Sequence, residues 1–263
     1  TLAELHFAKN ERLLRIQAHH SGLFWIILGR IRVSQMVREM RRFERFVVLT
    51  ETDRLQWAEA GCKQALVIPN PCSLCGITLP ALPREKEVLA VGRLHPQKGF
   101  DRLLRAWAPL EKRFPDWRLT IVGEGPERQH LETLIQSYKL ERASLVGAQN
   151  HIERYYSRAA LLAMTSRYEG LPLAMIEAMW CGTPCVSMNC PHGPEELIQK
   201  GGGLLVENGD ISAMTNALSM LMSDDGKRIA LGQKAQRYAQ NAFSETTILN
   251  QWLQVINDNT NKK

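Results

Sequence analysis

The sequence lacks a hydrophobic run that could cross a membrane. Its apolar stretch at residues 22–29 has eight residues, whereas a spanning helix needs about 20. The first six residues carry an acid and no apolar core, so they do not resemble a secretory signal peptide. We therefore expect a cytoplasmic protein, and contact with the inner face of the plasma membrane stays open.

The sequence also lacks a framework of paired cysteines. Its six cysteines include one Cys72-x2-Cys75 pair, and no second pair of matching spacing follows. Without a second pair a zinc site is disfavoured, which leaves a redox pair as the functional alternative. Cys181, Cys185 and Cys190 fall in or beside predicted helix and strand, where a free thiol behaves as a small hydrophobic group. We interpret the six as reduced structural thiols and expect no metal site.

What the chain does have is a surplus of positive charge. Its 263 residues carry 33 Lys and Arg against 27 Asp and Glu, which gives a net charge of +6 and favours anionic partners. Six arginines lie between Arg30 and Arg45 among apolar residues. This basic amphipathic pattern predicts either a helix on an anionic membrane surface or a solvated helix packed on its own domain. Without interleaved aromatic residues, it does not favour nucleic acid.

Short apolar segments alternate with helical patterns along most of the chain. The first group has strands at 46–49 and 65–68 around a helix at 51–60, and prolines between 69 and 83 then interrupt regular structure. The second group has strands at 88–91, 118–122, 144–146, 160–164, 185–187 and 203–206. Short, continuously apolar strands separated by helices predict a parallel sheet covered on both faces. Two further helices, with a break near Phe243 and Ser244, are expected at the end.

Several chemically distinctive residues follow these strands directly. Arg93, Gly123, Gly147, Thr165 and Asn189 each come after a predicted strand of the second group. Because parallel strands end at the same edge of a sheet, and ligands bind at that edge, we expect the candidate motifs to lie together there.

Two carboxylates, Glu169 and Glu177, lie around the start of a predicted helix at 173–180. Pro172 suits the first helical turn. Glu177 is the lone carboxylate in an apolar helix, and such groups are rarely buried without a partner; a basic neighbour in the sheet layer is the structural alternative. Glu169 precedes free N–H groups, which favour an anion. A carboxylate that accepts two hydroxyls and a helix start that receives phosphate together suit a sugar nucleotide.

The segment from Glu169 to Glu177 resembles the Glu-x7-Glu signature of retaining glycosyltransferases of family 4, whose GT-B fold has two facing Rossmann-like domains. Other segments are similar to motifs of that family in the same order: Val91 to Gly99, Ile121 to Pro126, Gly193 to Ile198 and Gly203 to Asp210. The resemblance implies an α/β chain of the GT-B type with a Rossmann-like parallel sheet and helices on both faces. The Gly-rich turn of the family's first domain is missing, so we expect an incomplete N-terminal domain.

The resemblance also implies roles for individual residues. Arg93 and Lys98 would stabilise the charge of a departing diphosphate, as suits a guanidinium and an ammonium, and the absence of any Asp-x-Asp pair predicts no metal or other cofactor. Glu169 would face the donor sugar or its phosphate, and either His19 or His20 would reach the sugar across the cleft. Glu177 would bind the ribose. The donor-binding positions are Gly92, Arg93, Lys98, Gly147, Ala148, Gln149, Gly170, Leu171 and Glu177.

The sequence as a whole predicts a donor-binding domain with part of an acceptor-side domain. We expect residues 1–70 to end the acceptor-side domain, 71–86 to be a linker, 87–243 to bind the nucleotide sugar and 244–263 to pack back on the first part. The predicted function is retaining, metal-independent transfer of a hexose from a UDP- or GDP-sugar to a growing or lipid-linked glycan, as in lipopolysaccharide, capsule or exopolysaccharide assembly. A catalytically silent sugar-nucleotide-binding domain and a GT-B sugar-nucleotide epimerase are the alternatives.

Overall fold

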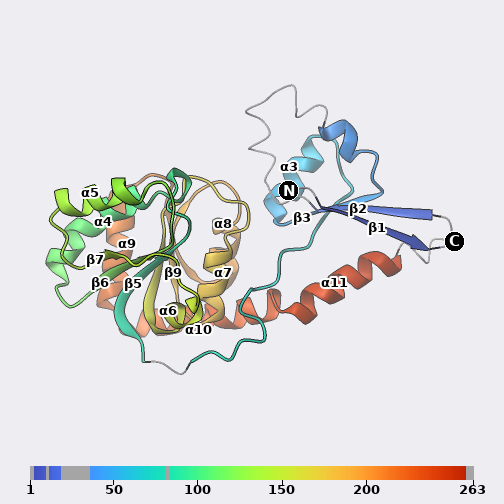
Figure 1. Cartoon of the computed structure of the whole chain (residues 1–263). Helices are drawn as coiled ribbons and strands as arrows, with labels where there is room; N and C mark the ends of the chain where they lie inside the picture. The colour runs from blue at the N-terminus through green and yellow to red at the C-terminus, as the bar shows by residue number, and fades with distance from the viewer. Residues whose placement is uncertain (1–2, 10–11, 19–35, 81–82, 259–263) are drawn as a thin grey trace.

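The computed structural model describes residues 3–9, 12–18, 36–80 and 83–258. These residues form two separate sheets, a larger one of six strands and a smaller one of four. An irregular segment links the sheets, and the last helix, drawn in red, extends from the larger unit towards the smaller sheet (Figure 1).

The larger sheet is parallel throughout, with the strand order β10-β9-β8-β5-β6-β7. Its strands are β5 (Glu85–Val91), β6 (Arg118–Val122), β7 (Ala143–Leu145), β8 (Ala159–Met164), β9 (Cys185–Asn189) and β10 (Gly203–Glu207). The helical elements are η1 (Pro96–Lys98), α4 (Phe100–Arg113), α5 (Arg128–Ser137), α6 (Ile152–Arg158), α7 (Leu173–Trp180), α8 (Pro194–Gly201), α9 (Ile211–Ser223) and α10 (Asp225–Ala242).

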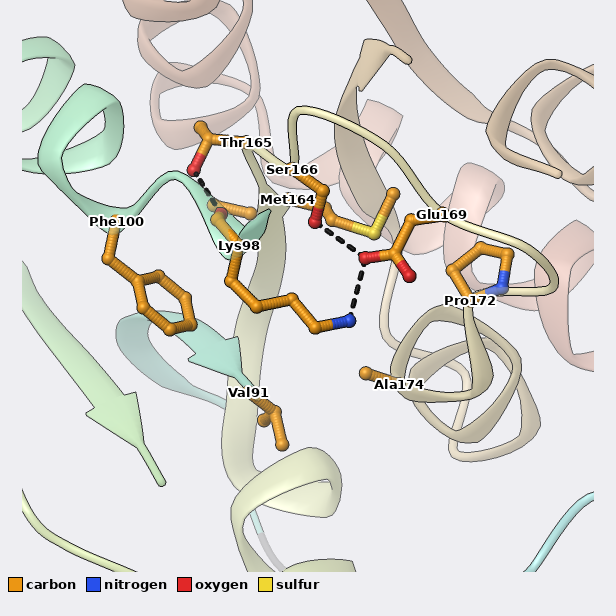
Figure 2. Close-up of a pocket in the computed structure, with 10 residues that line it drawn as sticks. Val91, Lys98, Phe100, Met164, Thr165, Ser166, Glu169, Pro172 and Ala174 are labelled. Atoms are coloured by element: carbon orange, nitrogen blue, oxygen red, sulfur yellow. Dashed lines mark hydrogen bonds and ion pairs between the residues drawn. The ribbon is translucent and has the colours of Figure 1, made fainter. Parts of the chain in front are cut away.

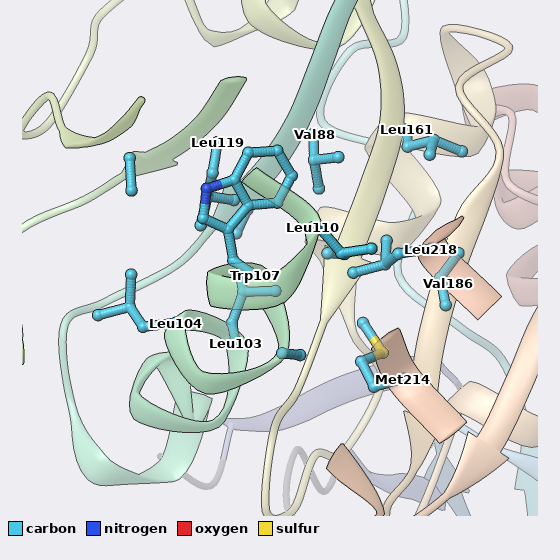
Figure 3. Close-up of a cluster of buried hydrophobic side chains, with 14 of the residues drawn as sticks. Val88, Leu103, Leu104, Trp107, Leu110, Leu119, Leu161, Val186, Met214 and Leu218 are labelled. Atoms are coloured by element: carbon cyan, nitrogen blue, oxygen red, sulfur yellow. The ribbon is translucent and has the colours of Figure 1, made fainter. Parts of the chain in front are cut away.

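Helices cover both faces of this sheet, so each face has its own apolar core. Successive strand residues point to opposite faces, and neighbouring Leu161 and Leu162 of β8 accordingly belong to different clusters. On one face Trp107 of α4 packs among strand and helix side chains (Figure 3); on the other, Met175 and Met179 of α7 are fully buried. The continuously apolar strands are therefore explained by burial on both sides.

The smaller sheet has the order β1-β2-β3-β4. Its strands are β1 (Ala3–Lys9), β2 (Arg12–Ala18), β3 (Arg45–Val48) and β4 (Ala65–Val67), with α3 (Glu51–Glu59) between the last two. β1 and β2 are antiparallel, whereas β2–β3 and β3–β4 are parallel. β1 and β2 are not among the predicted strands, although β1 alternates apolar and polar residues in the period-2 pattern of a strand.

The structure corrects the prediction of one basic helix from Arg30 to Arg45. Residues 36–40 are helical, the chain then turns, and Arg45 already begins β3; residues 30–35 lie outside the described residues. Met40 is buried against Phe46 and Trp57 of the same unit. The apolar side of the described part of this segment is therefore covered by its own domain, which is the second of the two alternatives.

The two units meet through the last helix and through polar contacts. In α11 (Glu245–Asp258), Ile248 packs against Val47 and Ile68 of the smaller unit. Between α3 and the region around α8, Asp53 lies 3.1 Å from His192. Glu196 of α8 also accepts a hydrogen bond from the N–H of Glu51, at 3.1 Å.

Candidate functional site

The loops that follow β5, β6, β7 and β8 lie along one edge of the larger sheet. Backbone hydrogen bonds join them: the N–H of Gly92 donates to Val122 at 3.0 Å, and that of Gly123 donates to Gly147 at 2.9 Å. A Cβ on Gly123 would lie 1.9 Å from the carbonyl oxygen of Gly92, so only glycine permits this approach. The parallel order thus brings the motifs at 92–98, 147–149 and 169–171 to the same edge.

Lys98, which is half-buried, and Glu169, which is buried, form an ion pair at this edge. Lys98 Nζ lies 2.7 Å from Glu169 Oε1, and Ser166 donates a hydrogen bond to the same oxygen at 2.6 Å (Figure 2). Glu169 is 5% exposed, and an ionised carboxylate at that depth needs such partners. These three side chains line a small pocket with Val91, Phe100 and Ala174. Within this pair, the charge of Lys98 is balanced by Glu169.

The short turn η1 explains how Lys98 is positioned. His95 caps its start, because His95 Nδ1 accepts a hydrogen bond from the N–H of Gln97 at 3.3 Å. Gly99 ends it with a φ of 63°, and a Cβ there would lie 2.1 Å from the carbonyl oxygen of Thr165. A Cβ on Gly92 would meet the Lys98 side chain at 3.2 Å. Both glycines therefore have a packing role, whatever ligand the edge binds.

Arg93 differs from Lys98 in having no anionic partner. Its side chain is exposed and makes no hydrogen bond or ion pair with any part of the chain that the structure describes. A guanidinium with all its donors available can hold two oxygens of one anion. Arg93 is therefore a cation at this edge whose charge no described residue balances, and it is available for phosphate.

The start of α7 faces the same region. Pro172 is the N-cap residue, so Leu173 opens the helix, as the sequence predicts. The N–H groups of a first turn have no partner within the helix and favour anions. A Cβ on Gly193 would lie 2.5 Å from the Pro172 ring, which shows how tightly the loop after β9 packs against this helix start.

Glu177, one carboxylate of the predicted signature, is held by two hydroxyl groups. Tyr156 donates to its Oε2 at 2.7 Å, and Ser73 donates to its Oε1 at 2.5 Å. Burial, and then the nearby Glu177 carboxylate, raise the pKa of Tyr156 well above its ordinary value, so the phenol stays protonated and donates. The predicted alternative of a basic partner is thus replaced by two neutral donors that sequence reasoning missed.

The other predicted positions are placed as follows. Gly147 has a φ of 77°, and the side-chain amide of Gln149 donates to the Val146 carbonyl at 2.8 Å. His19 and His20 lie outside the described residues. Within the ranges that the structure describes, no three His, Cys, Asp or Glu side chains form a metal-binding group, and no helix is long and apolar enough to span a bilayer.

Comparison with known proteins decides the family. The model of the family "Glycosyl transferases group 1" matches residues 79–241. The chain belongs to this family. A protein of Haemophilus influenzae, an "uncharacterized glycosyltransferase", is 32% identical over 85% of this chain and 65% of its own length. "Amylovoran biosynthesis glycosyltransferase AmsD" of Erwinia amylovora is 34% identical over 85% of this chain and 66% of its own length.

A solved structure of a similar protein has the same fold. A crystal structure of an S. aureus TarM variant, in complex with Fondaparinux, alpha-GlcNAc-glycerol and UDP, superposes with a TM-score of 0.78 at 27% identity. The match covers 85% of this chain and 46% of TarM. The predicted α/β fold of the GT-B type is confirmed. This chain spans slightly less than two thirds of the two curated relatives, at 65% and 66%.

Proposed function

We propose that this group 1 family member is a retaining, metal-independent glycosyltransferase of family 4. It moves a hexose from a UDP- or GDP-sugar to a growing or lipid-linked glycan, in lipopolysaccharide, capsule or exopolysaccharide assembly. The single observation that carries the proposal is the exposed, unpartnered Arg93 in the loop after β5, on the sheet edge where Lys98, Glu169 and the start of α7 line one pocket. The UDP bound in TarM and the biosynthetic name of AmsD support the same substrate class.

In this proposal each group has one task. Arg93 holds the diphosphate, with N–H groups near Gly170, Leu171 and Leu173 of the α7 start, and Glu177 accepts the ribose hydroxyls. Lys98 and Glu169 lie where the sugar joins the diphosphate. The bond between the anomeric carbon and the diphosphate oxygen breaks, the acceptor hydroxyl bonds to the same sugar face, and its proton passes to the departing diphosphate. Positioning and fixed positive charge then lower the barrier.

The remaining predictions belong to the same proposal. Residues 87–243 hold the donor around Gly147, Ala148 and Gln149, and 71–86 connect them to the acceptor-side part, 1–70, on which 244–263 pack. His19 or His20 reaches the sugar from that side. The protein works in the cytoplasm. Its exposed arginines 38, 41 and 42 would attract it to anionic lipid by charge alone, because Met40 packs in the core of the smaller unit and does not reach the membrane.

Ligand binding and product stereochemistry test the proposal. Thermal unfolding is followed with UDP, GDP and ADP and their glucose or mannose derivatives, because a ligand at about 100 times its Kd adds near 2.7 kcal/mol of stability. We expect one nucleoside diphosphate series to stabilise the chain with and without EDTA. Proton NMR then reads the anomeric configuration of any transferred sugar. No stabilisation by any of the three series contradicts the proposal, and an inverted product contradicts its retaining mechanism.

A further inference from the structure

Glu177 receives hydrogen bonds from two hydroxyls that reach it from different parts of the chain. Ser73 lies in the segment between β4 and β5, and 104 positions separate it from Glu177 in the sequence. Tyr156 lies in α6, next to α7. Neither hydroxyl carries charge, so neither neutralises the carboxylate. The pair therefore orients Glu177 without bringing a positive charge to it.

The two hydroxyls differ in their access to solvent. Tyr156 is fully buried, at 0% exposure, whereas Ser73 is exposed and Glu177 is half-buried between them. A carboxylate offers about four acceptor positions on its two oxygens. A ligand that arrives from solvent must therefore approach Glu177 from the side on which Ser73 already donates, while the Tyr156 side stays closed.

We propose that Ser73 occupies the acceptor position on Glu177 that a ribose hydroxyl of the donor takes, and that Tyr156 is a positioning residue that holds the carboxylate for that exchange. This inference rests on the proposed function, since it assumes that Glu177 binds ribose. It assigns a part of the donor site to the segment between the two sheets, outside residues 87–243.

The backbone around Ser73 is fixed, so that only its side chain has to move. The N–H of Cys72 donates to the carbonyl oxygen of Phe243 at 2.8 Å, and that of Cys75 donates to Cys72 at 3.1 Å. Cys72 and Leu74, on either side, are each 2% exposed and pack in the core under α7. Rotation of one short side chain therefore frees Glu177, without movement of the segment.

The proposal predicts opposite effects for the two hydroxyls. With Ser73→Ala the competing donor is gone, and UDP should bind about three- to tenfold more tightly, since a site blocked for part of the time loses affinity in proportion. With Tyr156→Phe the carboxylate loses its fixed orientation, and UDP should bind about tenfold more weakly. A purely structural pair would give two losses or no change.

Isothermal titration calorimetry on the whole chain tests this, with UDP and 2′,3′-dideoxy-UDP as probes. Ser73→Ala should gain affinity for UDP and none for the dideoxy compound, because that compound has no ribose hydroxyl to compete. Ser212→Ala, at an exposed serine in α9, is the matched control and should change neither Kd. Thermal unfolding without ligand checks that Tyr156→Phe is folded, and Ser73→Ala keeps the test open if it is not.

The outcomes separate the two proposals. Suppose that the wild-type protein binds UDP. If Ser73→Ala then binds UDP equally well or more weakly, or gains as much affinity for 2′,3′-dideoxy-UDP as for UDP, the role proposed for Ser73 is wrong and the proposed function stands. If wild-type protein binds none of UDP, GDP and ADP, the proposed function is wrong, and this inference with it.

Discussion

The two ends of strand β5 use the same residue types for different purposes. At the amino end, Glu87 is completely buried and is held by Arg158 at 2.9 Å and by the hydroxyl of Thr120 at 2.5 Å. At the carboxyl end, Arg93 is exposed without an anionic partner in the described chain. Arginine side chains lie at both ends. Those at the amino end are paired with Glu87, whereas Arg93 has no anionic partner among the described residues.

This difference shows why the residue type alone does not identify a site. At the amino end, the buried carboxylate is matched by Arg158 and, at 3.4 Å, by Arg118, and such a network is expensive to break. At the carboxyl end, Lys98 is matched by Glu169 and Arg93 is not. A buried charged side chain with an oppositely charged partner indicates a structural role. An exposed charged side chain without such a partner indicates a role in ligand binding.

The largest expected effect lies at the amino end. Glu87→Gln removes the buried negative charge and leaves Arg158 without its counterion, which should lower the free energy of unfolding by about 3 kcal/mol. Urea unfolding measures this. Glu85→Gln, at a half-exposed neighbour that also contacts Arg118, is the control and should cost under about 1 kcal/mol. The UDP affinity of folded Glu87→Gln should match that of the wild type. A tenfold loss would show that Glu87 also affects UDP binding, and would contradict the distinction between the two ends of β5.

Lys98 should show both kinds of effect. Lys98→Met leaves buried Glu169 without its cation, so that stability falls by about 2 kcal/mol and UDP affinity falls about tenfold. The double variant Lys98→Met with Glu169→Gln removes the stranded charge as well. Its stability should recover while its UDP affinity does not. Recovery of both would show that Lys98 acts only as a structural partner of Glu169.

Arg93 should affect binding alone. Arg93→Ala removes a side chain with no partner in the described chain, so the free energy of unfolding should stay within about 0.5 kcal/mol of the wild type. UDP affinity should fall about tenfold, as expected when a charged hydrogen bond to phosphate is lost. Arg105→Ala, at an exposed arginine of α4, is the control for net charge. An equal loss of UDP affinity in Arg93→Ala and Arg105→Ala would show that only the net charge of the protein matters, and not a contact of Arg93 with phosphate.

The smallest expected effect is a dependence on pH at the carboxyl edge. Burial alone would raise the pKa of Asp101, but the hydrogen bonds from Arg167, at 2.9 and 2.8 Å, together with the charge of Arg167 and the N–H of Arg102, outweigh this and lower the pKa. A lowered folded-state pKa stabilises the protein above the unfolded-state pKa, near 3.9, and this stability is lost as pH falls through the folded value. The free energy of unfolding, measured with urea, should therefore fall less steeply from about pH 6 to 3 in Asp101→Asn than in the wild type. Identical slopes would contradict this.

The sequence predicts local elements of this fold well and contacts between them poorly. The strand at 118–122 and the helix at 173–180 are confirmed with the predicted bounds, because a continuous apolar strand and a helix bounded by Pro172 and Gly182 are local signals. The prediction of a single basic helix ending at Arg45 is wrong, because the helical spacing of its apolar residues continues up to the point where β3 begins.

The partners in the candidate site depend on the tertiary fold. That the strand ends share an edge follows from the parallel alternation, and the structure shows it. That Lys98 pairs with Glu169, or that Ser73 reaches Glu177, does not follow from any local pattern, because 71 and 104 positions separate the partners. Nothing in the sequence distinguishes Ser73 beyond its place among prolines, or Tyr156 from other residues between the predicted strands at 144–146 and 160–164.

A crystal structure of this chain with UDP tests the central claim most directly. The account predicts the diphosphate within hydrogen-bonding distance of the Arg93 guanidinium and the first N–H groups of α7, with the ribose hydroxyls on Glu177. UDP bound elsewhere, or bound at this edge with Arg93 still pointing into solvent and Glu177 not in contact with ribose, would contradict it.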